Sequence, residues 1–144
     1  MKKNIENYPI VSWDWNRFDT AIRILIDRLR DQKPSTFVGV LAIPNGGYIP
    51  AVCVSKKLGF HGKIKPIYDD SVMTEGKYVI VDEITDSGKT MKYVADRFPN
   101  SIYCTLAATG RAKMVLANKK FFTAEEISNI WITFPWEIPG EEKV

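Results

Sequence analysis

One stretch of the chain, residues 78–91 (YVIVDEITDSGKTM), brings together side chains that could perform chemistry and a backbone that could position them. Asp82 and Glu83 are adjacent carboxylates, and an ionised carboxylate accepts hydrogen bonds from groups such as sugar hydroxyls. The small polar run from Thr85 to Thr90 follows them, and its backbone N–H groups could hold a phosphate. These residue types in this order predict a ribose 5-phosphate site.

A nucleoside-triphosphate-binding P-loop is the obvious rival, because Gly88-Lys89-Thr90 is how such a loop ends. That motif requires a glycine five positions before Gly88, where this chain has Glu83. A carboxylate there would repel a triphosphate. The pattern therefore argues against an NTPase.

The elements that must position these residues follow from the apolar pattern. Residues 78–81 are apolar and predict a short buried strand of a parallel sheet. The helical spacing of Met91, Val94, Ala95 and Phe98 predicts a helix that ends near Phe98. In open α/β sheets ligands bind at the carboxyl ends of strands, which is where the two acids stand.

The rest of the chain repeats this alternation of strands and helices. Helical spacing predicts helices over residues 14–31, with Ser12 or Asp14 as the cap, and 49–58, and apolar runs predict strands over 37–43, 64–68, 101–108 and 130–134. Residues 109–120 are basic and suggest a solvated or dimer-interface face. The alternation predicts an α/β fold with a mainly parallel central sheet flanked by helices, in one domain over residues 1–144.

A second candidate loop follows the predicted strand 37–43. It consists of Pro44, Asn45, Gly46 and Gly47, and its adjacent glycines leave backbone amides uncovered for a pyrophosphate. By itself the sequence is also that of an ordinary turn. Its position one strand–helix unit before residues 78–91 favours the binding interpretation.

Residues 78–91 resemble the phosphoribosyl-pyrophosphate (PRPP) signature of the type I phosphoribosyltransferases: a hydrophobic strand, two acids, two variable residues, then Asp-Ser/Thr-Gly-x-Thr. Residues 11–14, 45–50, 131–132 and 135–137 extend the likeness to the bacterial xanthine-guanine phosphoribosyltransferases. The resemblance implies the fold of that family, with a small C-terminal hood. It also implies Mg²⁺-dependent transfer of a 5-phosphoribosyl group from PRPP to a purine-type base (guanine, xanthine or hypoxanthine), with release of pyrophosphate, in nucleotide salvage.

The resemblance assigns roles to individual residues. Asp82 and Glu83 would hold the ribose hydroxyls, with Glu83 also contacting the Mg²⁺, and Asp86 would be the catalytic residue that handles the proton of the base nitrogen. The 5′-phosphate would be bound by Thr85, Asp86, Ser87, Gly88, Lys89 and Thr90, the pyrophosphate by Pro44, Asn45, Gly46 and Gly47, and the base by Trp131, Ile132 and Glu137.

Three departures from the family pattern keep other interpretations open. Asn45 stands where the family has a basic residue, and Ala108 where it has a lysine that contacts the purine 6-oxo group, a role that Arg111 or Lys113 would have to take. The loop that begins at Tyr68-Asp69 is short, so it would cover less of the site. A non-catalytic PRPP- or nucleotide-binding regulator, or a transferase for a non-purine base, would also fit these departures.

Composition sets the remaining expectations. The 144 residues carry a net charge of +3, from 20 basic and 17 acidic side chains, which gives no reason to expect a nucleic-acid partner. Cys53 and Cys104 lie in apolar surroundings and predict buried thiols of a reducing compartment. Because we find neither a membrane-spanning run nor a secretory signal, we expect a cytoplasmic protein without membrane contact. The family implies a homodimer or homotetramer.

Overall fold

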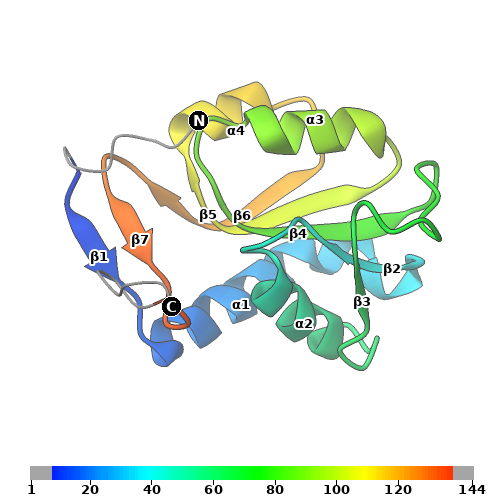
Figure 1. Ribbon diagram of the computed structural model, residues 1–144, viewed down its shortest axis with the longest axis horizontal. Coiled ribbons are helices and arrows are strands. Elements are labelled where there is room, and N and C mark those ends of the chain that lie inside the picture. Colours follow the sequence, from blue (N-terminus) through cyan, green and yellow to red (C-terminus); the bar gives the residue numbers. More distant parts are fainter. Residues whose placement is uncertain (1–7, 138–144) are drawn as a thin grey trace.

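The computed structural model describes residues 8–137, which form an α/β fold around a five-stranded parallel sheet (Figure 1). The strand order is β3-β2-β4-β5-β6, and every neighbouring pair is parallel. The strands are β2 (Gly39–Ala42), β3 (Ile64–Pro66), β4 (Tyr78–Thr85), β5 (Ile102–Thr109) and β6 (Phe121–Ile127). The predicted fold class, a mainly parallel sheet flanked by helices, is confirmed.

Helices cover both faces of the sheet. Helices α1 (Trp15–Leu29) and α2 (Tyr48–Lys57) lie on one face, and α3 (Lys89–Arg97) and α4 (Gly110–Val115) lie on the other (Figure 1). Two short 3₁₀ turns, η2 (Arg30–Gln32) and η3 (Pro34–Thr36), connect α1 to β2. Side chains alternate along β4, so Val79 and Val81 pack with α1 and α2 while Ile80 packs with α3. The sheet is therefore buried on both sides, which explains its continuous apolar runs.

Most predicted elements are present, with shifted boundaries. Asp14 is the cap of α1, because its carboxylate accepts a hydrogen bond of 2.8 Å from the Arg17 N–H. β4 runs to Thr85, beyond its predicted end at residue 81, since pairing with β5 continues as far as Thr85 and Ala108. Both acids therefore lie inside β4, and not after it.

Residues 109–127 are more regular than the sequence indicated. They contain the short helix α4 and the edge strand β6, neither of which was predicted. The basic side chains there also have specific partners: Lys113 Nζ lies 2.8 Å from Glu126 Oε1, and Lys119 Nζ lies 2.7 Å from Asp96 Oδ1. This segment therefore adds a helix and an edge strand to the fold, and its basic side chains form ion pairs at the surface. Its role as a dimer interface stays a prediction.

A separate two-stranded sheet forms the hood beside the main sheet (Figure 1). It pairs β1 (Ile10–Ser12) with β7 (Trp131–Thr133) in parallel, so the hood draws on both ends of the described chain and not on the C-terminal part alone. Rings anchor it to α1: Trp136 meets the α1 residue Phe18 edge to face at 5.3 Å, and Phe134 stacks on Trp136 at 5.0 Å between centroids. This packing fixes the strand that carries Trp131.

The strand order creates a topological switch point. From β2 the chain moves to β3 on one side, whereas from β4 it moves through β5 to β6 on the other side. The carboxyl ends of β2 and β4, which are neighbours, thus frame the crevice in which open α/β sheets bind ligands. Both loops singled out in the sequence, residues 44–47 and 86–88, begin at this crevice.

Other expectations concern single residues. Cys104 is buried, Cys53 is half-buried, and both are free thiols. His61 is exposed at the surface. Within residues 8–137, no helix is both long enough and apolar enough to cross a membrane.

Candidate functional site

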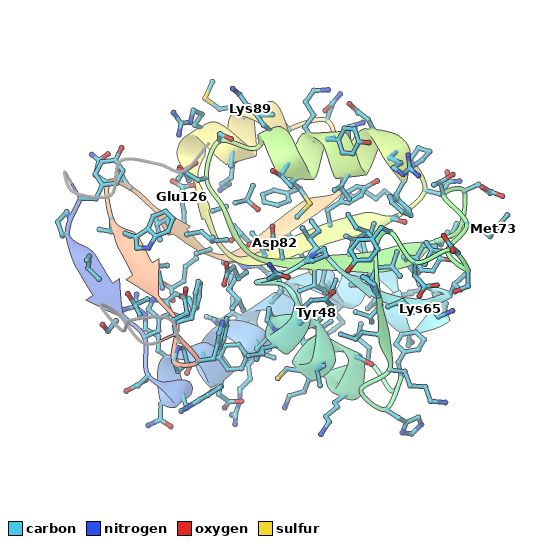
Figure 2. All side chains as sticks on the ribbon, in the orientation of Figure 1. Tyr48, Lys65, Met73, Asp82, Lys89 and Glu126 are labelled. Atoms are coloured by element: carbon cyan, nitrogen blue, oxygen red, sulfur yellow. The ribbon has the colours of Figure 1, made fainter. Side chains whose placement is uncertain are left out.

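A cavity of about 600 Å³ opens at the carboxyl end of β4. Tyr48 and Lys89, which begin α2 and α3, lie on opposite sides of Asp82 in Figure 2, so Asp82 stands between the helices that flank this region. The cavity is lined by three separate residues, Asp82, Arg111 and Trp131, and by one continuous segment: Ile84, Thr85, Asp86, Ser87, Gly88, Lys89, Thr90 and Met91. The predicted 5′-phosphate residues therefore all line one cavity.

The beginning of α3 has the properties of an anion site. Gly88 has φ +84°, a left-handed conformation that glycine adopts readily, and it turns the chain into the helix without a side-chain cap. The Thr85 hydroxyl is buried and has no hydrogen-bond partner within the described residues. A buried polar group normally has a partner. A ligand oxygen in the cavity would supply one.

Asp82 and Glu83 are half-buried acids with perturbed titration. Burial raises the pKa of Asp82 to about 7, against a smaller opposing effect of the hydrogen bond of 2.8 Å that it accepts from the Glu83 N–H. Burial also raises the pKa of Glu83 to about 7, and the negative charges of Asp82 and Glu137 add to the shift. Both carboxylates would be stabilised by hydroxyl donors or a cation.

The predicted pyrophosphate loop lies directly against Glu83. A Cβ atom on Gly46 would come within 2.1 Å of the Glu83 carboxyl carbon, and one on Gly47 within 2.4 Å of the Val81 carbonyl oxygen. The peptide bond between Pro44 and Asn45 is cis, and Asn45 is exposed. Glycines at these two positions thus allow the loop and the second acid to share one site.

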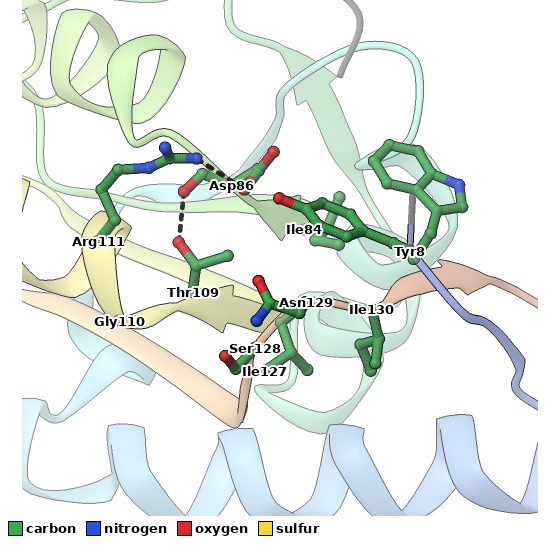
Figure 3. A pocket seen from close by; sticks show the side chains of 11 residues that line it. Tyr8, Ile84, Asp86, Thr109, Gly110, Arg111, Ile127, Ser128, Asn129 and Ile130 are labelled. Atoms are coloured by element: carbon green, nitrogen blue, oxygen red, sulfur yellow. Dashed lines mark hydrogen bonds and ion pairs between the residues drawn. The ribbon is translucent and has the colours of Figure 1, made fainter. Parts of the chain in front are cut away.

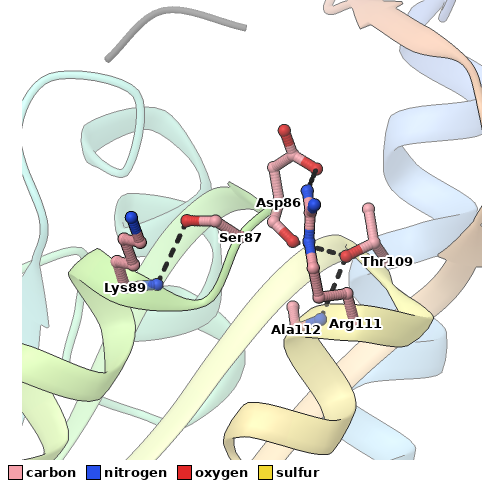
Figure 4. Close-up of polar contacts among 6 residues, drawn as sticks. All are labelled: Asp86, Ser87, Lys89, Thr109, Arg111 and Ala112. Carbon is pink, nitrogen blue, oxygen red and sulfur yellow. Dashed lines mark hydrogen bonds and ion pairs between the residues drawn. The ribbon is translucent and has the colours of Figure 1, made fainter.

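Asp86 is tied to the beginning of α4 by two contacts (Figure 4). Its carboxylate Oδ1 lies 3.2 Å from Arg111 Nη2, and its backbone carbonyl accepts a hydrogen bond from the Thr109 hydroxyl. Thr109 also caps α4, since its hydroxyl oxygen accepts a hydrogen bond of 3.1 Å from the Ala112 N–H. The cap therefore connects the loop after β4 to the helix after β5.

A second cavity, of about 320 Å³, adjoins the first (Figure 3). Ile84, Asp86, Arg111 and Trp131 line both cavities. The second cavity is completed by Tyr8, Thr109, Gly110, Ile127, Ser128, Asn129 and Ile130. In Figure 3, Arg111 and Tyr8 enter it from opposite sides, with Asp86 between them. The volume suits one planar ring system.

The three predicted base-binding residues occupy different positions around these cavities. Trp131 lines both, as a base-stacking residue should. The side chain of Ile132 is buried, so only its backbone could reach a base. The Glu137 carboxylate accepts a hydrogen bond of 2.9 Å from the Phe134 N–H, and its charge acts on Glu83. Their roles in binding stay predictions.

Several residues of the second cavity were not identified from the sequence. Tyr8, Thr109, Ser128 and Asn129 belong to segments without a recognisable motif. Of the two cations suggested for the place of the missing lysine, Arg111 lines both cavities, whereas Lys113 pairs with Glu126 outside them. The sequence signal that could have pointed to this cavity was the position of Thr109-Gly110-Arg111 at the end of a predicted strand.

Asp82 and Glu83 could hold a hard cation such as Mg²⁺ only if a substrate supplied further oxygen ligands. Residues 8–137 contain no group of three or more His, Cys, Asp or Glu side chains that could hold a metal ion. Mg²⁺, however, is usually held by one or two carboxylates together with waters and substrate oxygens. Two adjacent acids with raised pKa values, beside a glycine loop, have the donor chemistry for that arrangement.

The known proteins that resemble this chain are phosphoribosyltransferases. No protein-family model matches the chain. Xanthine-guanine phosphoribosyltransferase of Idiomarina loihiensis is 25% identical over 142 residues, which cover 86% of this chain and 84% of that protein. The enzyme of the same name from Gluconobacter oxydans is 27% identical over 150 residues, covering 91% and 85% of the two chains.

Solved structures agree. The purine phosphoribosyltransferase of Pyrococcus horikoshii superposes with a TM-score of 0.69 at 28% identity, over 93% of this chain and 99% of that chain. The parallel sheet, the PRPP signature at its switch point and likeness over most of the length thus point the same way. In fold and in sequence, the chain is therefore similar to purine and xanthine-guanine phosphoribosyltransferases.

Proposed function

We propose that the protein transfers the 5-phosphoribosyl group of PRPP to a ring nitrogen of an oxo-purine (guanine, xanthine or hypoxanthine) and releases pyrophosphate. The observation that carries this proposal is the pair of adjoining cavities that share Asp86 and Trp131. One is lined by Asp82 and by the residues predicted to bind the 5′-phosphate, and the other has the size of a base. The names of the relatives, which are purine or xanthine-guanine enzymes, support the choice of base.

The larger cavity would take the ribose 5-phosphate part of PRPP. The N–H groups at the beginning of α3 and the buried Thr85 hydroxyl would hold the 5′-phosphate. Asp82 and Glu83 would accept hydrogen bonds from the ribose hydroxyls. The loop 44–47, in contact with Glu83, would hold the pyrophosphate through backbone amides.

Asp86 stands at the boundary between the two cavities, where the anomeric carbon and the base nitrogen would meet. Its carboxylate could accept the proton that the base nitrogen loses, or stabilise positive charge on the ribosyl group in an oxocarbenium-like transition state. Trp131 would hold the base by stacking, which is worth about 1–3 kcal/mol per base.

Glu83, with Asp82 beside it, would hold Mg²⁺ together with ribose and pyrophosphate oxygens. When bound, the ion would neutralise the charge of the leaving pyrophosphate. Asn45 adds no positive charge to this loop, so backbone amides and the cation would carry the anion. We further propose that the reaction serves nucleotide salvage.

The experiment is to measure pyrophosphate release from PRPP and Mg²⁺, offering guanine, xanthine, hypoxanthine, adenine and a non-purine ring separately. We expect release that depends on an oxo-purine. Release with the non-purine ring alone would contradict the proposed base. No release with any base, together with PRPP binding by calorimetry, would instead favour a binding-only regulator.

A further inference from the structure

We propose that Thr109 is a positioning residue for the phosphate-binding loop: by holding the backbone carbonyl of Asp86, its hydroxyl orients the Ser87 N–H group toward the 5′-phosphate. This inference rests on the proposed function, since it concerns the phosphate subsite of the same reaction. Thr109 stands at the end of β5 and lines the smaller cavity, whereas the phosphate would bind in the larger one. Its effect on the phosphate would therefore pass through the backbone of the loop.

The Thr109 hydroxyl has two partners, and both are backbone groups (Figures 3 and 4). It donates its single proton to the Asp86 carbonyl, and it accepts a hydrogen bond of 3.1 Å from the Ala112 N–H. With its one donor engaged, the hydroxyl has no proton to offer a ligand in the smaller cavity. The side chain instead ties the loop after β4 to the beginning of α4.

The geometry of the peptide bond makes this contact act on the next residue. The bond between Asp86 and Ser87 is trans, and in a planar trans peptide the carbonyl and the N–H point in opposite directions. A carbonyl held by Thr109 therefore keeps the Ser87 N–H pointing away from Thr109. Ser87 lines the larger cavity, just before the beginning of α3, where backbone N–H groups can bind an anion.

The helix that Thr109 caps also supports the loop by packing. A Cβ atom on Gly88 would lie 3.1 Å from the Cβ atom of Val115 and 3.3 Å from the Cα atom of Ala112, so the turn before α3 lies directly against α4. α4 has only six residues, too few to be stable by itself, and its position depends on its cap and on such contacts. The Thr109 hydroxyl thus holds both the loop and the helix behind it.

The side chain of Asp86 has a separate anchor. Its carboxylate Oδ1 lies 3.2 Å from Arg111 Nη2, and this ion pair does not involve the Thr109 hydroxyl. Loss of the hydroxyl would therefore release the backbone of Asp86 and leave its carboxylate paired. We expect phosphate binding to suffer more than the proton transfer that is proposed for Asp86.

The test replaces Thr109 by valine, which has nearly the same shape but no hydroxyl, and by serine, which keeps the hydroxyl. Asp14→Ala is the matched control, because Asp14 caps α1 and lines neither cavity. Like Thr109→Val, this control removes a helix cap and lowers stability. The readout is calorimetric affinity for GMP and for guanosine, which differ by the 5′-phosphate, together with KM for PRPP and kcat.

We expect the wild type to bind GMP about a hundred-fold more tightly than guanosine, since several hydrogen bonds to a charged phosphate are involved. Thr109→Val should reduce this ratio about ten-fold, as for one hydrogen bond to a charged group, and raise KM for PRPP with little change in kcat. Thr109→Ser should keep most of the ratio, and Asp14→Ala all of it.

An unchanged ratio of the two affinities in folded Thr109→Val would overturn the inference and leave Thr109 as a helix cap alone. An equal fall of the ratio in Asp14→Ala would also overturn it, because the effect would then follow from lower stability. Thermal unfolding of each variant would verify that all are folded.

Failure of the proposed function would look different. A protein that releases no pyrophosphate with any base, but whose GMP preference falls in Thr109→Val, would not be a transferase and would still use Thr109 to position the loop. A wild type that transfers ribose 5-phosphate to an oxo-purine while Thr109→Val keeps the full GMP preference would be the converse case.

Discussion

The two cavities of the site are built in opposite ways. The larger one is formed mainly by consecutive residues, 84–91, which leave β4, turn at Gly88 and begin α3. The smaller one combines residues near positions 8, 84–86, 109–111 and 127–131. Its walls meet only because β5 and β6 extend the sheet on one side of β4 and because β1 pairs with β7.

This difference has a consequence for what each cavity can recognise. A phosphate and a ribose need backbone N–H groups and acids in a fixed local order, and one strand–turn–helix segment supplies both. A base needs a flat surface and donors at its edge, which separate segments can supply in many combinations. We therefore expect substitutions in the first cavity to affect PRPP, and those in the second, Thr109 excepted, to affect the base.

The largest effect should come from Gly47→Ala. A Cβ atom there would lie 2.4 Å from the Val81 carbonyl oxygen and 2.5 Å from that of Ile43, and these backbone atoms can move little. Overpacking of this kind costs about 3 kcal/mol in unfolding free energy. Urea denaturation would measure the loss.

The matched control is Gly39→Ala, because a Cβ atom at Gly39 would meet nothing within 4 Å. If both alanine variants were equally stable, the close approach of the loop to β4 would not be a constraint on the fold. PRPP affinity of the folded fraction should fall with Gly47→Ala, while base binding to the second cavity should not.

The next effect is on catalysis. Asp86→Asn should lower turnover at least ten-fold, because the amide cannot accept the proton or balance positive charge, while PRPP affinity stays near that of the wild type. Pyrophosphate release and calorimetry measure the two quantities. Asp96→Asn is the control, since Asp96 pairs with Lys92 and Lys119 at the surface. Unchanged turnover in Asp86→Asn would remove this residue from the mechanism.

The contrast between the first cavity, built from consecutive residues, and the second, built from separate segments, also explains what the sequence could predict. The β4–α3 segment was recognisable because strand, acids and glycine turn follow one another, so local spacing contains the geometry. The sheet itself followed from apolar runs, since strands buried on both faces are continuous in sequence. The edge strand β6 was missed, and the length of β4 was underestimated because its pairing with β5 carries it past the acids.

The second cavity could be predicted only in part. Trp131 was identified through a family resemblance, but Asn129 and Tyr8 have no local pattern, and β6 reads as an irregular run of aromatic and acidic residues. Edge strands and short helices depend on their partners more than on their own sequence. Arg111 was one of two cations suggested for the place of the missing lysine, and only the fold, which brings Arg111 to Asp86 and Lys113 to Glu126, distinguishes them.

Trp131→Ala would test the base stacking proposed for the second cavity. Loss of stacking should weaken base affinity about ten-fold, while PRPP affinity stays within two- to three-fold of the wild type. Tyr93→Ala, which removes an exposed ring on α3, is the control. Trp131 lines both cavities. If the variant lost affinity for the base and for PRPP equally, Trp131 would instead be a structural residue of the hood.

The smallest expected effect is on how stability depends on pH. It tests the proposal that the first cavity binds a cation. Asp82 has a pKa of about 7 in the folded protein against an ordinary value near 3.8, and burial is the main cause. Between these values the folded state binds more protons than the unfolded state. Stability is therefore greatest below about pH 4 as far as this group is concerned, and falls as the pH rises towards 7.

Replacing the acid should flatten that decline. We expect the unfolding free energy of Asp82→Asn to fall less steeply than that of the wild type between pH 5 and pH 8. Glu83 has a pKa raised in the same direction, so the variant should retain part of the slope. Chemical denaturation at a series of pH values, with and without Mg²⁺ and pyrophosphate, measures it. If the unfolding free energy of the wild type changed with pH as steeply as that of Asp82→Asn, water would already satisfy this carboxylate. Its raised pKa would then be no argument for a cation and ribose subsite.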